Sequence, residues 1–311
     1  MIRTTYPTLI LGDLSPSDAQ QERLRALGCE LSHLPATAPE GAVRGALGDS
    51  RFVLFNNVDI NPVLDAFGGV ELAVLAATGY SFLDVERARA LRIPIANLPD
   101  YSAVSAVEYM LWGALVAMRP LHAADARVRA GDWSKGGMRG RDLFGATAGV
   151  IGYGQIGRRL AARLEALGMC VQVNTRTPGS EEARSWVSLE RLLETSDVVF
   201  VCCSLNPGSH HLLDARQLQR LHAAAVLVSV SPNPVVDLCA LAALLAERPA
   251  TRAVLDLDPI DDGHPLLACE NATLTPHVAF LTEGTLERRV NGCIDAVHGF
   301  LNGGAVHYVV R

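Results

Sequence analysis

Residues 147–167 read TAGVIGYGQIGRRLAARLEAL, and this stretch decides the fold. An apolar strand pattern over 147–151 runs directly into a G-x-G-x-x-G motif, and an amphipathic helical pattern follows. The first glycine permits a tight turn, the second lets the backbone approach a pyrophosphate, and the third lets the helix pack against the strand. A bare glycine motif is weak evidence, but here the strand and the helix supply its context. The stretch predicts a dinucleotide-binding βαβ unit with a phosphate loop of Gly152, Gly154, Gln155, Ile156 and Gly157.

The second strand of this unit is predicted to end at Asn174, about 20 residues after the glycines. Units that bind NAD place an Asp or Glu here, which hydrogen-bonds the ribose 2′-hydroxyl. This chain has Asn174, Thr175 and Arg176 instead. No carboxylate repels a 2′-phosphate, and a guanidinium is available to bind one. Arg176 could also stack on the adenine or point to solvent. The sequence therefore favours NADP(H) over NAD(H).

Short apolar runs alternate with helical patterns along the whole chain, which is typical of βαβ units and a parallel sheet. Strands are predicted at 8–11, 51–55, 72–76, 148–151, 171–174, 198–202, 225–230, 253–257 and 272–275. Apolar residues at steps of three and four predict one long helix over 102–118. The aperiodic stretch 130–140 is interpreted as a loop leading into a new domain. The predicted fold class is α/β, with two Rossmann-like doubly wound parallel-sheet domains.

Composition excludes several classes of protein. The net charge is −6, and Lys135 is the only lysine among 27 basic residues. The arginines are scattered, whereas nucleic-acid binding needs a clustered basic face. No apolar run reaches the ~18 residues of a membrane span, and no signal peptide is recognisable. Seven cysteines form neither a disulfide framework nor a paired zinc motif, so no metal site is predicted. We expect a cytoplasmic protein with a small-molecule substrate.

Four further segments carry a family resemblance: AATGYSFLD at 76–84, IANLPDYS at 95–102, GRDL at 140–143 and TPHVA at 275–279. In this order, and with the glycine loop, they resemble the D-isomer-specific 2-hydroxyacid dehydrogenase family. The resemblance implies a dinucleotide-binding domain over 99–279, inserted into a substrate domain formed by 1–98 and 280–311. It places the active site in the cleft between the two domains, and implies that the first segment binds substrate through Thr78, Gly79 and Tyr80.

The resemblance also implies a homodimer that exchanges the helices around the 95–102 crossover. The apolar helix predicted over 102–118 fits that role, although a helix buried within one subunit would show the same pattern.

Three catalytic groups are implied by the resemblance. His277 would give a proton to the substrate carbonyl oxygen as hydride arrives from nicotinamide, a carboxylate would orient it, and an arginine would bind the substrate carboxylate. Asp256 matches the family aspartate that faces the nicotinamide carboxamide. Pro259 stands at the position of the catalytic glutamate, and Asp258 could replace that group through a one-residue shift and a shorter reach. Further candidates for the carboxylate are Asp261 and Asp262.

The arginine of this family has no counterpart. The family reads approximately V-N-T-A-R-G-G-L-V-D where residues 228–237 read VSVSPNPVVD, so Pro232 takes its place. Two charge-assisted hydrogen bonds are lost, each about 1.5–3 kcal/mol. Pro232 and Asn233 are predicted to form a neutral substrate wall, with hydrogen bonds offered by Asn233 and Ser231. Other conceivable cations are Lys135, Arg139 and Arg252.

These features favour an NADP(H)-dependent oxidoreductase that reduces a C=O or C=N group with His277 as the acid/base. Its substrate would be a small molecule other than a standard 2-keto acid. One alternative is a catalytically impaired dinucleotide-binding protein that acts as a sensor or partner-binding module. Another is an ordinary glyoxylate or hydroxypyruvate reductase with a relocated cation.

Overall fold

The computed structural model describes residues 5–178 and 185–311, and the chain divides into two compact units. Unit 1 comprises Met1–Ser102 with Thr282–Arg311, and unit 2 comprises Ala103–Leu281. The sequence-based division placed its two boundaries after residues 98 and 279, four and two residues before those between the two units. The aperiodic stretch 130–140 lies inside unit 2, between α5 (Leu121–Arg129) and β6 (Thr147–Ile151). The stretch therefore does not separate two domains, and the prediction that it leads into a new domain is wrong.

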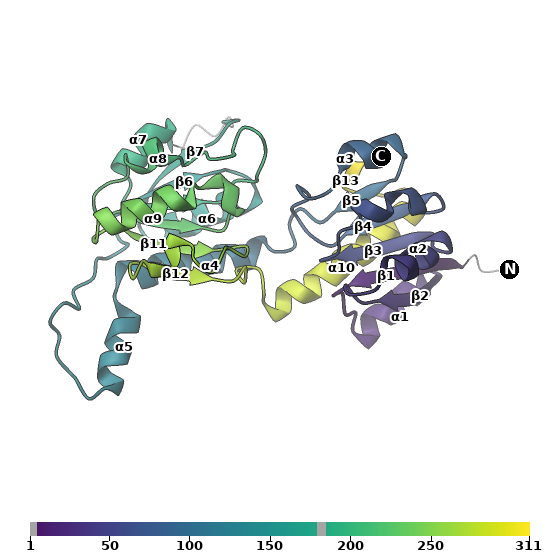
Figure 1. The fold of residues 1–311 in the computed structure, drawn as a ribbon, viewed down its shortest axis with the longest axis horizontal. Helices are drawn as coiled ribbons and strands as arrows, with labels where there is room; N and C mark the ends of the chain where they lie inside the picture. Colours follow the sequence, from purple (N-terminus) through teal and green to yellow (C-terminus); the bar gives the residue numbers. More distant parts are fainter. Residues whose placement is uncertain (1–4, 179–184) are drawn as a thin grey trace. The chain divides into compact units, whose positions relative to one another are not determined.

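Unit 2 is built on a seven-stranded parallel sheet with the order β12-β11-β10-β9-β6-β7-β8 (Figure 1). The strands after β6 are β7 (Cys170–Asn174), β8 (Ser185–Trp186), β9 (Val198–Val201), β10 (Val226–Ser229), β11 (Arg252–Asp256) and β12 (Ala272–Thr275). β7 and β8 are added in turn on one side of β6. The chain then crosses to the other side of β6, where β9, β10, β11 and β12 are added in turn. This is the strand order of doubly wound nucleotide-binding sheets, whose ligands bind where the direction reverses, at the carboxyl ends of the strands.

Helices cover both faces of this sheet because the strand side chains alternate between two cores. In β9, Val198 and Phe200 face a core shared with α4 and α6, whereas Val199 and Val201 face a core shared with α7, α8 and α9. The long predicted helix is α4, which begins at residue 103. The helices of unit 2 are α4 (Ala103–Met118), α5, α6 (Gln155–Ala166), α7 (Leu189–Thr195), α8 (Ala215–Leu218) and α9 (Leu238–Glu247), with 3₁₀ turns η2 (Asn233–Val235) and η3 (Pro265–Ala268).

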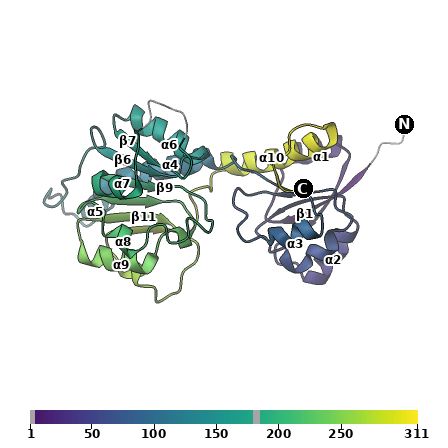
Figure 2. The ribbon, with the colours of Figure 1, turned by 90° about the horizontal axis from the view of Figure 1, so that it is seen from above.

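The described residues of unit 1 form a six-stranded sheet with the order β13-β5-β4-β3-β1-β2, in which only β13 runs antiparallel. Its strands are β1 (Tyr6–Gly12), β2 (Cys29–Leu34), β3 (Phe52–Asn56), β4 (Leu72–Leu75), β5 (Ile95–Asn97) and β13 (Tyr308–Val310). Its helices are α1 (Asp18–Ala26), α2 (Glu40–Gly48), η1 (Asn61–Phe67), α3 (Val85–Ala90) and α10 (Glu283–Asn302). In Figure 2, α1 and α10 lie on one side of this sheet and α2 and α3 on the other. The predicted fold class is confirmed.

Both ends of the chain build unit 1. β13 pairs with β5, and Gln20 of α1 donates hydrogen bonds to Glu287 O (3.3 Å) and Asn291 Oδ1 (3.2 Å) of α10. Unit 2 is therefore an insertion between β5 and α10.

Candidate active site

The glycine loop follows β6 at the point where the sheet order reverses. Gly152 has a φ of 97°, in the left-handed region that favours glycine. A Cβ on Gly157 would lie 2.0 Å from Gly152 O, so this glycine is required for α6 to pack against the loop. A Cβ on Gly154 would meet no atom within 4 Å. Protein packing therefore explains Gly157, whereas Gly154 leaves open space in front of the loop.

That space adjoins the amino end of α6, where Gly154 is the N-cap and no side chain caps the helix. The N–H groups of a first helical turn have no partner within the helix and favour negative charge. A pyrophosphate fits both the open space and these donors. Of the other predicted loop residues, Ile156 packs against the core, and Gln155 Oε1 accepts a hydrogen bond from Arg159 (2.8 Å).

Tyr153 lies within the glycine loop, and its side chain anchors the loop to the rest of unit 2. Its side chain is buried and its ring meets Trp186 edge-on, with centroids 5.1 Å apart. The Arg158 guanidinium lies 5.0 Å from the Tyr153 ring centroid, and its Nε donates to Tyr153 O (3.2 Å). These contacts hold the loop in a defined shape before any ligand binds.

The end of β7 carries the residues predicted to select the cofactor. Asn174 donates from Nδ2 to Val187 O (3.0 Å), and its main-chain carbonyl accepts from Gly152 N (2.8 Å). Thr175 follows, and Arg176 is exposed. Residues 174–178 contain one cation and no carboxylate.

His277 and Asp258 meet at the carboxyl edge of the same sheet, just beyond the paired strands β12 and β11. His277 Nδ1 lies 2.7 Å from Asp258 Oδ1, with 59% and 45% of the two side chains exposed. An ionised carboxylate only accepts hydrogen bonds, so Nδ1 carries the proton and Nε2 remains for a substrate. The other candidate carboxylates, Asp261 and Asp262, are exposed in a turn, and within residues 5–178 and 185–311 neither forms an ion pair with His277.

The main chain at His277 is held in a left-handed conformation, with a φ of 53°. Such a conformation costs of order 1–3 kcal/mol and persists only where its surroundings hold it. The buried Asp256 carboxylate supplies that hold, since it accepts from Thr275 Oγ1 (2.6 Å), Val278 N (2.7 Å) and Ala279 N (2.8 Å). Asp256, predicted to face the nicotinamide, thus binds the segment that carries His277.

Tyr109 of α4 extends this network and was missed by sequence reasoning. Thr275 Oγ1 donates to Asp256, so the Tyr109 hydroxyl donates to Thr275 Oγ1, at 2.7 Å. Burial raises the pKa of Tyr109 to about 12, with the negative charge of Asp256 acting in the same direction, so the phenol stays a neutral donor. Thr275 belongs to the TPHVA segment, which could have suggested a role for it. Tyr109 gave no such signal, because it lies within a helix whose pattern is otherwise apolar.

The segment after β10 carries the residues predicted to stand in place of the family arginine. Ser231 was expected to offer a hydrogen bond to substrate, but it is buried and its hydroxyl donates to Cys203 O (2.8 Å). Pro232 and Asn233 are half-buried. Asn233 forms two hydrogen bonds with the main chain of Asp258: its Nδ2 donates to Asp258 O (3.0 Å), and its Oδ1 accepts from Asp258 N (3.1 Å).

Two of the three conceivable substitute cations, Arg252 and Arg139, belong to segments at the amino edge of the sheet. Arg252 is the first residue of β11, four residues before Asp256, or about 13 Å along the strand. Arg141 binds Asp197 Oδ1 (3.4 Å) and Ala224 O (2.6 Å), which precede β9 and β10, so the segment with Arg139 returns to the amino edge. Lys135, four residues earlier than Arg139, is exposed. The expectation that Arg252 or Arg139 could replace the arginine is not supported.

The predicted substrate loop follows β4 in unit 1. Thr78 Oγ1 donates to Leu98 O (2.9 Å), and Asn97 Nδ2 donates to Thr78 O (2.7 Å), which fixes the loop to β5. A Cβ on Gly79 would meet no atom within 4 Å, and Tyr80 is 43% exposed. The loop is therefore anchored at its base and open at its tip.

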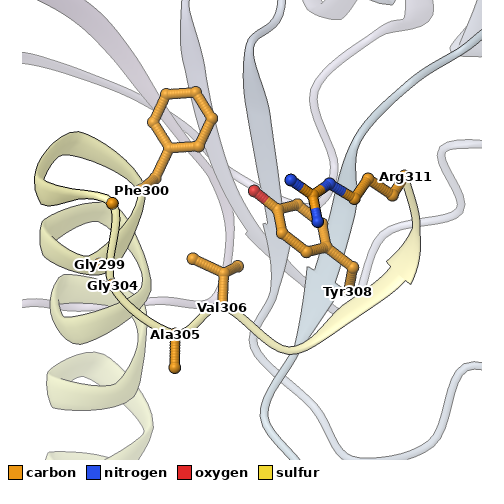
Figure 3. A pocket seen from close by; sticks show the side chains of 8 residues that line it. Gly299, Phe300, Gly304, Ala305, Val306, Tyr308 and Arg311 are labelled. Atoms are coloured by element: carbon orange, nitrogen blue, oxygen red, sulfur yellow. The ribbon is translucent and has the colours of Figure 1, made fainter.

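Unit 1 also contains a hollow of about 400 Å³ at the carboxyl end of α10. Figure 3 shows the Arg311 guanidinium beside the Tyr308 ring, 5.2 Å from its centroid. The hollow is lined by Gly299, Phe300, Gly303, Gly304, Ala305, Val306, Tyr308 and Arg311. None of the predicted site residues lines it.

In the described part of the chain, no three His, Cys, Asp or Glu side chains are grouped so that they could hold a metal ion. Likewise, no helix within residues 5–178 and 185–311 is both long and apolar enough to cross a membrane.

The doubly wound sheet, the glycine loop at its point of reversal and the uncapped α6 define the class of dinucleotide-binding α/β proteins. The sequence model of the D-isomer specific 2-hydroxyacid dehydrogenase NAD-binding domain matches residues 111–279. A glyoxylate reductase from Thermococcus onnurineus is 31% identical over 72% of this chain and 71% of its own length. A glycerate dehydrogenase from Methylorubrum extorquens is 30% identical over 85% and 87%.

Among solved structures, an NADPH-dependent glyoxylate/hydroxypyruvate reductase from Sinorhizobium meliloti, in complex with NADP and malonate, superposes with a TM-score of 0.83. It is 25% identical, with 98% of this chain and 97% of that chain covered. The chain belongs to the D-isomer specific 2-hydroxyacid dehydrogenase family, so the predicted family is confirmed. It is an NAD(P)-dependent oxidoreductase that acts on CH–OH donors.

Proposed function

We propose that this chain uses NADP(H) to reduce a C=O or C=N group of a small molecule that is not a standard 2-keto acid. One observation carries the proposal: the His277–Asp258 pair is intact at the carboxyl edge of the cofactor-binding sheet, and the neighbouring segment is neutral at Pro232. The proton donor of the reaction is thus present without the cation that would bind a substrate carboxylate.

The residues of unit 2 fit a nicotinamide dinucleotide. The open space at Gly154 and the amino end of α6 would hold the pyrophosphate, and Thr175 and Arg176 would hold a 2′-phosphate. When bound, the reduced cofactor supplies the hydride for the substrate carbon.

His277 supplies the proton that completes the reduction. In its protonated form it donates from Nε2 to the carbonyl oxygen, or to the imine nitrogen, as the adjacent carbon gains the hydride. The C=O π-electron pair forms the new O–H bond, and His277 is left as neutral imidazole. Asp258, bonded to Nδ1, holds the ring in this orientation and stabilises its positive charge before transfer. Oxidation of an alcohol uses the same atoms in reverse.

The neutral wall selects the substrate. A family arginine would give a substrate carboxylate two parallel hydrogen bonds, which Pro232 and Asn233 do not replace with charge. The Asn233 amide is already bonded to Asp258 on both its oxygen and its nitrogen. A ketone, an imine or a larger intermediate without a carboxylate next to the reacting carbon therefore suits this wall.

A second candidate is an ordinary glyoxylate or hydroxypyruvate reductase, which the names of the relatives favour. It requires a cation that binds the substrate carboxylate from outside the segment 228–237. The intact His277–Asp258 pair gives no support to a catalytically impaired sensor, since a sensor has no need of an oriented histidine.

Cofactor binding tests the first half of the proposal. We expect NADPH to change its fluorescence on binding and to raise the melting temperature of the protein. We expect Arg176→Ala to weaken NADPH binding at least about tenfold, which is the equivalent of one charge-assisted hydrogen bond. The affinity for NADH should stay within about twofold of the native value. The dissociation constants are measured by fluorescence titration, with Arg216→Ala on α8 as the control. The absence of any response at millimolar NADPH would contradict the function, and equal losses for NADPH and NADH would contradict the NADP preference.

We further propose a homodimer, and α5 supports this. In Figure 1, α5 and the segment after it project from the body of unit 2, and no residue of α5 is buried. Leu121 (53%), Val128 (43%) and Trp133 (77%) expose large apolar side chains there. Burial against a second copy would remove this apolar surface from water.

A further inference from the structure

Asn233 clamps the main chain of Asp258. The two hydrogen bonds, at 3.0 and 3.1 Å, join the amide donor and acceptor of Asn233 to the acceptor and donor of a single residue. A flipped amide would place oxygen against oxygen and N–H against N–H, so the orientation of the amide is fixed by its partner. The clamp connects two segments separated by 25 positions in the sequence.

The segment that carries Asn233 is itself anchored on both sides. Ser231 Oγ donates to Cys203 O (2.8 Å), and Pro234 O accepts from His211 N (2.7 Å). Prolines flank Asn233 on each side, and their rings restrict φ. The amide is therefore held by a stiff support.

Asp258 depends on such a support. It lies beyond the end of β11, and Leu257 N makes the last bond to β12, to Thr275 O (2.8 Å). An aspartate has one methylene fewer than a glutamate, so its carboxylate follows the main chain with less freedom to adjust. The main-chain position at Asp258 therefore decides whether Oδ1 reaches His277 Nδ1.

We infer that Asn233 is a positioning residue for proton transfer, which acts through Asp258 on His277. It fixes the Asp258 main chain so that the short carboxylate keeps the proton of His277 on Nδ1 and leaves Nε2 for the substrate. This inference rests on the proposed role of His277 and gives Asn233 a task other than substrate contact.

The first test is spectroscopic and needs neither cofactor nor substrate. The ring ¹⁵N shifts of His277, observed through its carbon-bound protons, report which nitrogen carries the proton in neutral imidazole. We expect the Nδ1–H tautomer in the native protein and a mixture with Nε2–H in Asn233→Ala. The same change is expected in Asn233→Asp, which is isosteric but sets an oxygen against Asp258 O. An unchanged tautomer in both variants overturns the inference.

Asn271→Ala is the matched control. The Asn271 amide donates to Leu245 O (3.0 Å), Arg248 O (3.4 Å) and Thr251 O (2.8 Å), just before β12 begins. Its loss removes side-chain to main-chain bonds in the same unit, at the opposite edge of the sheet. We expect this variant to lower the melting temperature and to leave the His277 tautomer unchanged.

The second test is kinetic, with NADPH and whichever of hydroxyacetone and hydroxypyruvate the native protein reduces faster. We expect Asn233→Ala to lower kcat about 10- to 100-fold with KM nearly unchanged, and to alter the pH profile of kcat. In an Asp258→Ala background, we expect Asn233→Ala to lower kcat no further, because the carboxylate through which Asn233 acts on His277 is already absent. Equal losses in both backgrounds overturn the inference.

The two proposals fail in different ways. If His277→Gln and Asp258→Ala both turn over like the native protein, the proposed function fails, and the tautomer measurement still tests the clamp. If both variants lose turnover while Asn233→Ala keeps the native tautomer and pH profile, the function stands and the inference falls.

Discussion

His277→Gln is expected to lower the rate of NADPH oxidation by about 10²- to 10⁴-fold, the range that general acid catalysis contributes. Glutamine fills similar space but cannot take up and release the proton that the reduction consumes. NADPH affinity should stay within about twofold, because the site proposed for the pyrophosphate is the glycine loop and does not include His277. Stopped-flow absorbance of NADPH measures the rate, and fluorescence titration measures the affinity.

His264→Gln is the control for this experiment. His264 is a second histidine of unit 2 with a structural contact, since its Nδ1 accepts from Leu266 N (3.1 Å) at η3. It should retain native turnover. If His277→Gln also retained it, another group would have to be the acid, and the assignment of the His277–Asp258 pair would be wrong.

Substitutions in the glycine loop are expected to have the second large effect. One glycine should be required for stability and the other for cofactor binding. We expect Gly157→Val to destabilise unit 2 by about 1–3 kcal/mol or more, because the added Cβ would lie 2.0 Å from Gly152 O. We expect Gly154→Val to lower the melting temperature by no more than about 4 °C, because valine is a poorer N-cap than glycine but its Cβ would meet nothing within 4 Å. Yet this variant should weaken NADPH binding at least about tenfold, since the valine side chain enters the space assigned to the pyrophosphate.

Thermal melts of the free protein and NADPH titrations separate the two glycines. Native affinity in Gly154→Val would show that the cofactor does not approach this loop. A strong loss of stability in the same variant would show that Gly154 serves packing instead of ligand binding.

Local sequence patterns were sufficient to predict the framework of the fold. Each predicted strand has a counterpart, because buried parallel strands are continuous apolar runs. Four of the described strands were not predicted, namely β2, β5, β8 and β13. β5 reads IAN, and three residues are too few to form a recognisable apolar run. β2 reads CELSHL with alternating polar residues at a sheet edge, and β8 has two residues. β13 could not be foreseen, since its place beside β5 depends on contacts between the two ends of the chain.

The site was predictable only where its parts adjoin in sequence. The glycine loop and the TPHVA segment are local motifs, so they could be read directly. The hydrogen bonds from Asn233 to Asp258 and from Tyr109 to Thr275 join residues 25 and 166 positions apart, and no periodicity reports them. Arg252 directly precedes the strand predicted over 253–257, whereas ligands bind where such strands end, so the sequence already indicated the wrong edge of the sheet for this cation.

The most direct test of the account compares 2-keto acids with ketones in which a methyl group replaces the carboxylate. The pairs are hydroxypyruvate with hydroxyacetone, pyruvate with acetone, and phenylpyruvate with phenylacetone, and kcat/KM is measured from NADPH oxidation. Two charge-assisted bonds from an arginine would favour the acid about 10²- to 10⁴-fold. With Pro232 at the position predicted for that arginine, we predict that kcat/KM for at least one ketone equals or exceeds that of its acid. A preference for every acid of more than about 100-fold would contradict the account and establish an ordinary 2-keto acid reductase.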